Sequence, residues 1–353
     1  MKAQRHGGLL DREIETLHVT PSRIADFSVN VNPYGPHPAV ARAARAADLT
    51  RYPDPTARAV RVALGTHLRV SPDRLVLGNG AAELMWSLAR ALLVAGDVTL
   101  IVEPTFSELP SAAIAAGARI AAWRARAGDR FAVDAAAVSA AVRVSGARLA
   151  YLCTPNNPTG AHFPAREVAA LARRHPETTW IVDQAFLPLS PHHDEGATRF
   201  PANVVTLRSL TKDHAIPGLR IGYLVTTAAI AARIEAARAP WTTSSPAQAA
   251  ALATLRTGDF VARSRDRLLA DRDALAASLR SLGLDPLPSS APFLLVDVGH
   301  ATRLKNRLLE NHRVLVRDGT SFGLPRHVRL AGRPAKDRAR LVRALRAELP
   351  LET

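Results

Sequence analysis

The sequence of 353 residues is poor in cysteine, and its single thiol, Cys153, cannot form an internal disulfide. It also lacks any run near the ~18 apolar residues that a membrane-spanning helix requires. The first fifteen residues carry charges where a secretory signal peptide has its apolar stretch. We therefore expect a soluble cytoplasmic protein with no membrane partner, since a free thiol suits a reducing compartment.

No basic block stands out, although Lys and Arg total 46 and the formal net charge is +15. The arginines are spread along the whole chain and are interleaved with alanine, without the aromatic interleaving or motif of a nucleic-acid-binding domain. We therefore expect no nucleic-acid partner. A weak attraction of the surface for anions remains in keeping with the charge.

The chain contains no internal repeat, and apolar β-rich runs alternate with alanine-rich helical stretches. The runs cover residues 75–77, 98–102, 149–153, 179–182, 204–207 and 221–225. Such alternation predicts an α/β fold with a mostly parallel sheet covered by helices. A long helical region from 245 to about 282, broken near Gly258, leads to further runs at 293–298, 314–316 and 328–330, and then to a basic helix over 334–348.

Polar motifs follow these runs, where the carboxyl ends of parallel strands bind ligands. They are Gly78-Asn-Gly-Ala-Ala-Glu83, Glu103-Pro-Thr-Phe106, Thr154-Pro-Asn-Asn-Pro-Thr-Gly160, Asp183-Gln-Ala-Phe186 and Ser209-Leu-Thr-Lys212. Each has an ordinary alternative, because Gly78-Asn-Gly80 is also a tight turn and Asp183 a helix cap. Ser209 and Lys212 also match the S-x-x-K of penicillin-binding enzymes, but the partner motifs of those enzymes are missing.

The order of the five motifs, followed by Arg220, resembles the fold-type I enzymes of the class I/II aminotransferase superfamily, which use pyridoxal 5′-phosphate (PLP). The resemblance runs over nearly the whole chain. It implies a large domain with a mostly parallel seven-stranded sheet and a smaller α/β C-terminal domain. We expect an N-terminal segment over residues 1–29 that closes over the active site, a large PLP-binding domain over 30–244 and a small domain over 245–353.

The resemblance also implies roles for individual residues. Lys212 would form the Schiff base with the cofactor and then transfer protons as the catalytic residue. Asp183 would pair with the pyridine nitrogen, and Phe106 would stack on the ring. The remaining cofactor-binding residues implied are Gly80, Ala81, Ala82, Asn157, Phe186, Ser209 and Arg220, together with Tyr52 from a neighbouring subunit. A tyrosine that crosses between subunits implies a homodimer with shared active sites.

Within the superfamily, the closer resemblance is to L-threonine-O-3-phosphate decarboxylases of cobalamin synthesis, with histidinol-phosphate aminotransferases next. The stretches that carry it include His6-Gly-Gly8, Asp26-Phe-Ser-Val-Asn-Val-Asn-Pro-Tyr-Gly35 and Arg51-Tyr-Pro-Asp54. Phe186 favours the decarboxylases, because aminotransferases commonly carry tyrosine there. The resemblance implies that a phosphorylated amino-acid substrate is bound by His6, Asn32, Asn157, Arg317 and Arg329, since guanidinium groups bind carboxylate and phosphate bidentately.

The resemblance thus leaves two functions open. One is decarboxylation of L-threonine O-3-phosphate to (R)-1-amino-2-propanol O-2-phosphate, and the other is transamination of a phosphorylated amine such as histidinol phosphate with 2-oxoglutarate. Departures from the family pattern are Gln184 after the strand-end aspartate and Asp213-His214 after the lysine. The cluster His192-His193-Asp194-Glu195 is interpreted as a solvated loop, and no metal site is expected.

Overall fold

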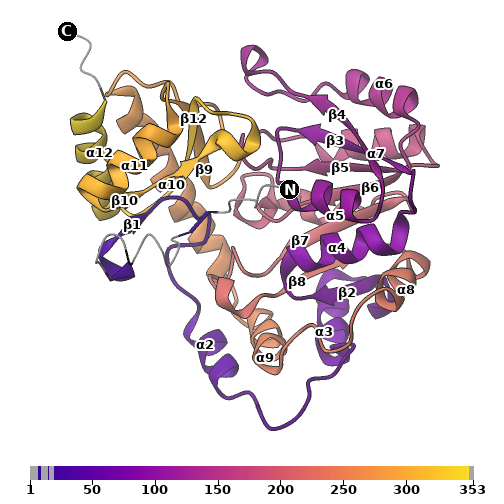
Figure 1. The fold of residues 1–353 in the computed structure, drawn as a ribbon. Helices are drawn as coiled ribbons and strands as arrows, with labels where there is room; N and C mark the ends of the chain where they lie inside the picture. Colours follow the sequence, from indigo (N-terminus) through magenta and orange to yellow (C-terminus); the bar gives the residue numbers. More distant parts are fainter. Residues whose placement is uncertain (1–6, 9–14, 16–19, 350–353) are drawn as a thin grey trace.

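The computed structural model describes residues 7–8, 15 and 20–349. Its large domain is built on a seven-stranded sheet (Figure 1), in the order β2-β8-β7-β6-β5-β3-β4. Only β8 runs antiparallel to its neighbours, so the mostly parallel α/β sheet of the prediction is confirmed. The strands are β2 (Leu75–Gly78), β3 (Val98–Glu103), β4 (Arg119–Arg124), β5 (Leu149–Cys153), β6 (Thr179–Asp183), β7 (Val204–Ser209) and β8 (Gly222–Val225).

Strand β4 has no counterpart among the apolar runs of the sequence. It lies at the edge of the sheet and pairs only with β3. Its side chains are exposed or half-buried, and arginines stand at both of its ends. Its four central residues, 120–123, are apolar but include two alanines, which are depleted in strands, so the run resembles the alanine-rich helical stretches around it.

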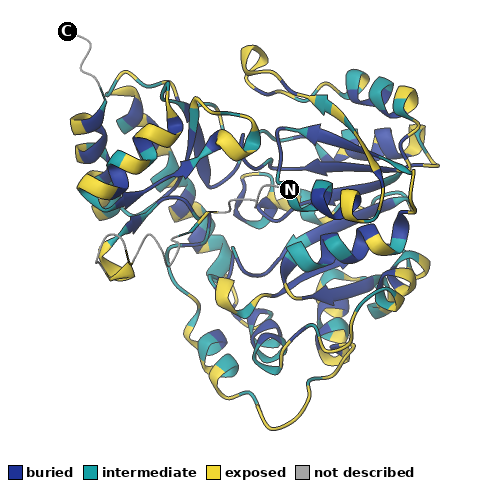
Figure 2. Ribbon diagram, viewed as in Figure 1, coloured by how far each residue is buried: buried dark blue, intermediate teal, exposed yellow. Residues whose placement is uncertain are grey.

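Helices cover both faces of the sheet, and Figure 2 shows the strands between them as the most buried part of the large domain. One face packs against α4 (Gly80–Leu92), α5 (Glu108–Ala115) and α8 (Ala228–Ala236). The opposite face packs against α6 (Ala135–Ser145) and α7 (Ala165–Arg174) at one end, and against α2 (Pro38–Arg45), α3 (Arg58–Leu68) and α9 (Ser245–Thr254) at the other. No helix in the described part of the chain is both long and apolar enough to span a membrane.

A smaller domain contains the antiparallel sheet β11-β12-β9. Its strands are β9 (Phe293–Asp297), β11 (Arg317–Asp318) and β12 (His327–Ala331), which pack with α10 (Phe260–Arg280), α11 (Ala301–His312) and α12 (Ala335–Glu348). Near the N-terminus, β1 (Ala25–Asp26) pairs in parallel with β10 (Val314–Leu315). The chain therefore crosses from the small domain to the large one soon after β1.

The helical region predicted from residue 245 onward is divided between two cores. Ala247 and Ala250 of α9 share an apolar cluster with Leu75 of the large domain. Leu275 and Leu279 of α10 belong to the core of the small domain. The boundary at residue 245 stays a prediction, and so does the closing role of residues 1–29, most of which lie outside the described part of the chain.

Candidate active site

A cavity of about 280 Å³ opens at the carboxyl ends of the sheet strands and is closed on one side by the small domain. We call it the active-site cavity. Its lining contains most of the residues predicted from the motifs: Ala81, Ala82, Phe106, Asn157, Asp183, Phe186, Ser209, Lys212, Arg220, Arg317 and Arg329. Residues distant in the sequence meet here because parallel strands end at one edge of a sheet.

Lys212 follows β7 and reaches the floor of the cavity. Its Nζ lies 5.2 Å from the centroid of the Phe186 ring. Burial lowers the pKa of the Lys212 amine, and the nearby Asp183 carboxylate acts in the opposite direction. A buried lysine with a lowered pKa has more of the neutral, nucleophilic amine at neutral pH. The residue is therefore suited to attack an aldehyde carbon.

Asp183 is the last residue of β6 and is also buried. The Tyr151 hydroxyl donates to its Oδ2 at 3.1 Å, and the Ala185 amide donates to its Oδ1 at 2.9 Å. Burial raises the pKa of the carboxyl group, while Lys212 and these two donors lower it. A fixed buried carboxylate of this kind is suited to hold a protonated ring nitrogen.

Backbone and side-chain donors meet at the N-terminus of α4. Gly80 has φ 79°, and a Cβ there would collide with the Arg220 guanidinium. A Cβ at Gly222 would stand 2.9 Å from the Ala81 amide nitrogen. Both glycines therefore keep space for close approach, and Ser209 borders the same space. A helix N-terminus beside a guanidinium and a hydroxyl fits a phosphate group.

Two buried arginines from the small domain form the opposite wall. Arg317 on β11 and Arg329 on β12 are direct register partners, and their exposed fractions are 8% and 5%. Arg329 donates to Asn157 Oδ1 and, at 2.6 Å, to the Ser28 carbonyl oxygen. Burial and the charge of Arg317 lower the pKa of Arg329 to about 9. An anion bound between these two cations would relieve their repulsion.

Three of the predicted residues that the structure describes, Gly80, Tyr52 and Asn32, do not line the cavity. Tyr52 is 82% exposed and its ring lies 5.0 Å from that of Trp241. Asn32 is buried. Its backbone N–H donates to the Lys212 carbonyl oxygen and its side-chain Nδ2 donates to the Asp213 carbonyl oxygen, both at 2.9 Å. It thus fixes the lysine loop. His6 lies outside the described residues, whereas Gly7 borders the cavity.

Several residues that line the active-site cavity are not among those predicted from the sequence. They include Ser28, Asn30, Met85, Thr211 and Phe322. Ser28 and Asn30 lie inside the stretch 26–35 that carries the family resemblance, so a signal existed. The Ser28 contact to Arg329 uses the backbone carbonyl, which no residue type reveals. Phe322 had no signal, because its position depends on the turn that follows β11.

The cluster at residues 192–195 is more ordered than a solvated loop. The rings of His162 and His192 stack at 3.8 Å, and Glu195 Oε1 lies 3.2 Å from His162 Nε2. The sequence gave no sign that His162 would join the cluster. The nitrogen lone pairs of an imidazole lie in the plane of its ring. The His162 and His192 ring planes are nearly parallel and separate, so one ion cannot lie in both planes. His162 is thus hydrogen-bonded to Glu195 and stacked on His192, whose Nε2 lies 3.2 Å from Ser290 Oγ, and we assign no metal to the group.

Known proteins resemble the chain over almost its full length. Residues 22–347 match the family described as aminotransferase class I and II. The histidinol-phosphate aminotransferase of Symbiobacterium thermophilum is 36% identical over 92% of this chain and 91% of its own. Among solved structures, the histidinol-phosphate aminotransferase of Sinorhizobium meliloti in complex with pyridoxal-5′-phosphate has a TM-score of 0.87 and 26% identity, with 96% of this chain and 94% of that chain covered.

The L-threonine-O-3-phosphate decarboxylase of Porphyromonas gingivalis is also similar, with a TM-score of 0.78 and 25% identity, over 91% of this chain and 98% of that one. Lys212, Asp183 and the phosphate-sized space at the start of α4 fit PLP. The order of the seven-stranded sheet and the family match over residues 22–347 support the same assignment. The chain therefore belongs to the class I and II aminotransferase family and is a PLP-dependent enzyme.

Proposed function

We propose that the protein is an aminotransferase that acts on a phosphorylated amine such as histidinol phosphate, with 2-oxoglutarate as amino acceptor. The observation that carries the proposal is 36% identity to a histidinol-phosphate aminotransferase over 92% of the chain. Other curated relatives with that name are 31–34% identical over more than 90% of the chain. The sequence motifs resemble the decarboxylases more closely, so this branch is the second of the two functions that they imply.

PLP, when bound, supplies a ring that accepts electrons from the substrate Cα. Asp183 would hold the ring nitrogen in its protonated form, and Ser209, Arg220 and the amides at the start of α4 would hold the phosphate. Lys212 would hold the cofactor through its side-chain amine. The Lys212 amine would take the proton from the substrate Cα, and its lowered pKa favours the neutral form that can act as a base.

Arg317 and Arg329 suit both substrates of this reaction. Histidinol phosphate carries a phosphate and 2-oxoglutarate carries two carboxylates, so each offers an anion at a distance from its reacting carbon. Guanidinium groups bind either anion bidentately. Because the two arginines are register partners in one small-domain sheet, substrate binding would also draw the small domain toward the cavity.

A homodimer with shared active sites belongs to the same proposal. Tyr52 lies outside its own cavity, on the loop between α2 and α3 that Figure 2 shows as exposed. Its ring contacts that of Trp241 at a tilt of 34°, and Trp241 is itself 48% exposed. Exposed neighbouring aromatics are typical of interfaces, and we expect Tyr52 to bind the cofactor phosphate of a second copy.

Decarboxylation of L-threonine O-3-phosphate is the second candidate. Phe186 favours it, because its ring faces Lys212 with no hydroxyl to offer the cofactor. The two reactions differ in which bond at Cα stands perpendicular to the cofactor ring. The cavity arginines and the substrate together set that angle.

The test supplies the PLP-loaded protein with histidinol phosphate and 2-oxoglutarate, and measures glutamate. A parallel reaction contains L-threonine O-3-phosphate without a keto acid, and carbon dioxide is measured. We expect glutamate to form in the first reaction and no carbon dioxide to form in the second. Carbon dioxide from the second reaction, without turnover in the first, would replace the aminotransferase by the decarboxylase.

A further inference from the structure

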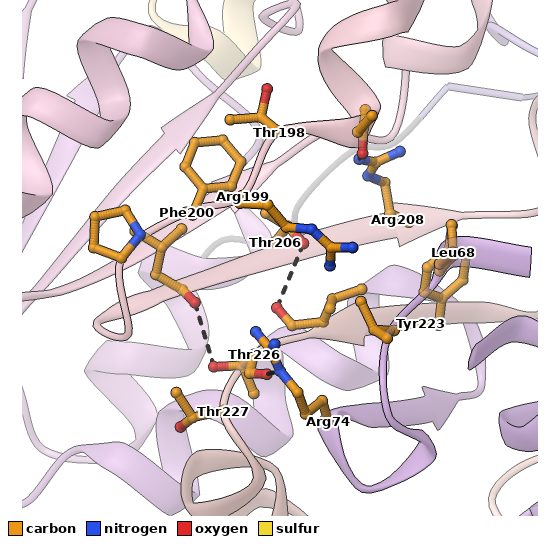
Figure 3. A pocket seen from close by; sticks show the side chains of 16 residues that line it. Leu68, Arg74, Thr198, Arg199, Phe200, Thr206, Arg208, Tyr223, Thr226 and Thr227 are labelled. Atoms are coloured by element: carbon orange, nitrogen blue, oxygen red, sulfur yellow. Dashed lines mark hydrogen bonds between the residues drawn. The ribbon is translucent and has the colours of Figure 1, made fainter. Parts of the chain in front are cut away.

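A second cavity of about 150 Å³ lies on the face of the large sheet that packs against α3 and α7. We call it the rear cavity. Leu68 at the end of α3, Arg74 in the turn before β2 and the segment 196–201 surround it, and β7 and β8 form its floor. Figure 3 shows the side chains that line it.

Three arginines line the rear cavity: Arg74, Arg199 and Arg208. In Figure 3 the side chains of Arg74 and Arg199 extend into it from opposite sides. Arg74 Nε donates to the Thr226 carbonyl oxygen at 2.7 Å, and Arg199 Nη2 donates to the Arg69 carbonyl oxygen at 2.9 Å. Arg208 donates to Gln184 Oε1 at 2.8 Å and to the Gly196 carbonyl oxygen at 3.1 Å.

These partners are all neutral. Within the described residues, none of the three guanidinium groups forms an ion pair with a carboxylate, whereas other arginines, such as Arg238 and Arg272, do. Each guanidinium has five N–H donors, and the bonds given above use one or two of them. Three like charges around one small cavity repel one another, and an anion among them would remove that repulsion.

The rest of the lining fits an anion with a small apolar part. The hydroxyl-bearing residues Thr198 and Thr227 border the cavity, and Val70, Val204 and Phe200 supply apolar wall. The volume lies below the ~300 Å³ at which pockets for drug-sized ligands begin. This size excludes a nucleotide and allows a single phosphate group with a short organic body.

We propose that the rear cavity binds a small oxyanion of the phosphate class, held by Arg74, Arg199 and Arg208. The site is separate from the cofactor site. Arg208 and Ser209 are consecutive on β7, and consecutive strand residues point to opposite faces. Arg208 therefore faces the rear cavity while Ser209 borders the active-site cavity.

The test compares thermal melting midpoints of the PLP-loaded protein in inorganic phosphate and in chloride of equal ionic strength. A ligand that binds the folded state raises the midpoint by mass action. Arg199 is the residue to change, because it is exposed and, among the described residues, its one side-chain hydrogen bond is to a backbone carbonyl. We expect Arg199→Gln to weaken the apparent phosphate affinity about tenfold, since a charge-assisted hydrogen bond is lost.

Arg199→Lys should recover part of the affinity, because it keeps the charge. Arg173→Gln is the matched control, since Arg173 is an exposed arginine on α7 that does not line the cavity. Phosphate bound in the active-site cavity contributes equally to all these variants. An equal phosphate-dependent rise in the wild type and in Arg199→Gln would overturn the proposal.

The source of the anion is tested by repeating the titration with histidinol phosphate. Tighter binding of the organic phosphate that Arg199→Gln abolishes would assign the site to a phosphorylated metabolite. An effect of inorganic phosphate that the organic compound does not exceed would assign it to free phosphate. Transamination by Arg199→Gln should stay unchanged, which shows that the active-site cavity is intact.

Discussion

The active-site cavity and the rear cavity share strand β7 but compensate their charges differently. In the active-site cavity, the Lys212 amine lies near the Asp183 carboxylate, and Arg329 of the small domain donates to Asn157 of the large domain. In the rear cavity, all lining residues belong to the large domain, and the cations have only neutral partners. Opposite charges drawn from distant segments suit a reaction in which protons and anions move. Like charges drawn from one domain suit passive binding of an anion.

The largest expected effect lies at Lys212. Lys212→Ala should abolish turnover, because no other described residue in the active-site cavity carries an amine that can hold the cofactor and move the Cα proton. The absorption band of lysine-bound PLP should disappear as well, while far-UV circular dichroism stays unchanged. A variant that keeps the band would show that another lysine holds the cofactor.

A smaller effect is expected where charge is kept but geometry is lost. Arg329→Lys retains a cation in the active-site cavity but loses the planar fork that binds an anion through two bonds. We expect KM for the phosphorylated amine to rise roughly 10-fold to 100-fold with a lesser change in kcat, measured by steady-state kinetics. The matched variant in the rear cavity, Arg199→Lys, should leave KM unchanged. Equal changes in both variants would remove the distinction between the two cavities.

The smallest effect concerns the pH dependence of Lys212 in protein freed of PLP. Burial lowers the pKa of this amine, so its neutral form is present at lower pH than in a free lysine. The rate of labelling by an amine-reactive reagent should rise with pH and level off below the ordinary lysine pKa. Peptide mass spectrometry resolves the site.

Asp183→Asn sharpens this measurement. The Asp183 carboxylate favours the charged form of Lys212 and so raises its pKa. Removing that charge should move the plateau to still lower pH. A plateau that moves upward in Asp183→Asn would mean that the two groups do not interact as described.

Much of the fold could be predicted because buried strands have a local signature. All six apolar runs of the large domain became strands within a few residues of their predicted ends, and α9 and α10 are separated at Gly258 as expected. Strand β4 was not predicted because its short apolar run, residues 120–123, contains two alanines and resembles the alanine-rich helical stretches. The position of Asn32 in the site could not be predicted either. It was expected to bind substrate, but it holds the backbone of Lys212 and Asp213 instead.

The sequence by itself determined which side chains follow which strand, and therefore which ones meet at the carboxyl edge of the sheet. Lys212, Asp183, Asn157 and Ser209 were predicted in this way, since parallel strands turn sequence order into spatial proximity. Only the tertiary structure decided the contacts between segments with no such rule. They include the register of Arg317 with Arg329, the stacking of His162 on His192 and the three arginines of the rear cavity. These contacts depend on how whole domains and loops pack, which is a long-range property that no local pattern of residues encodes.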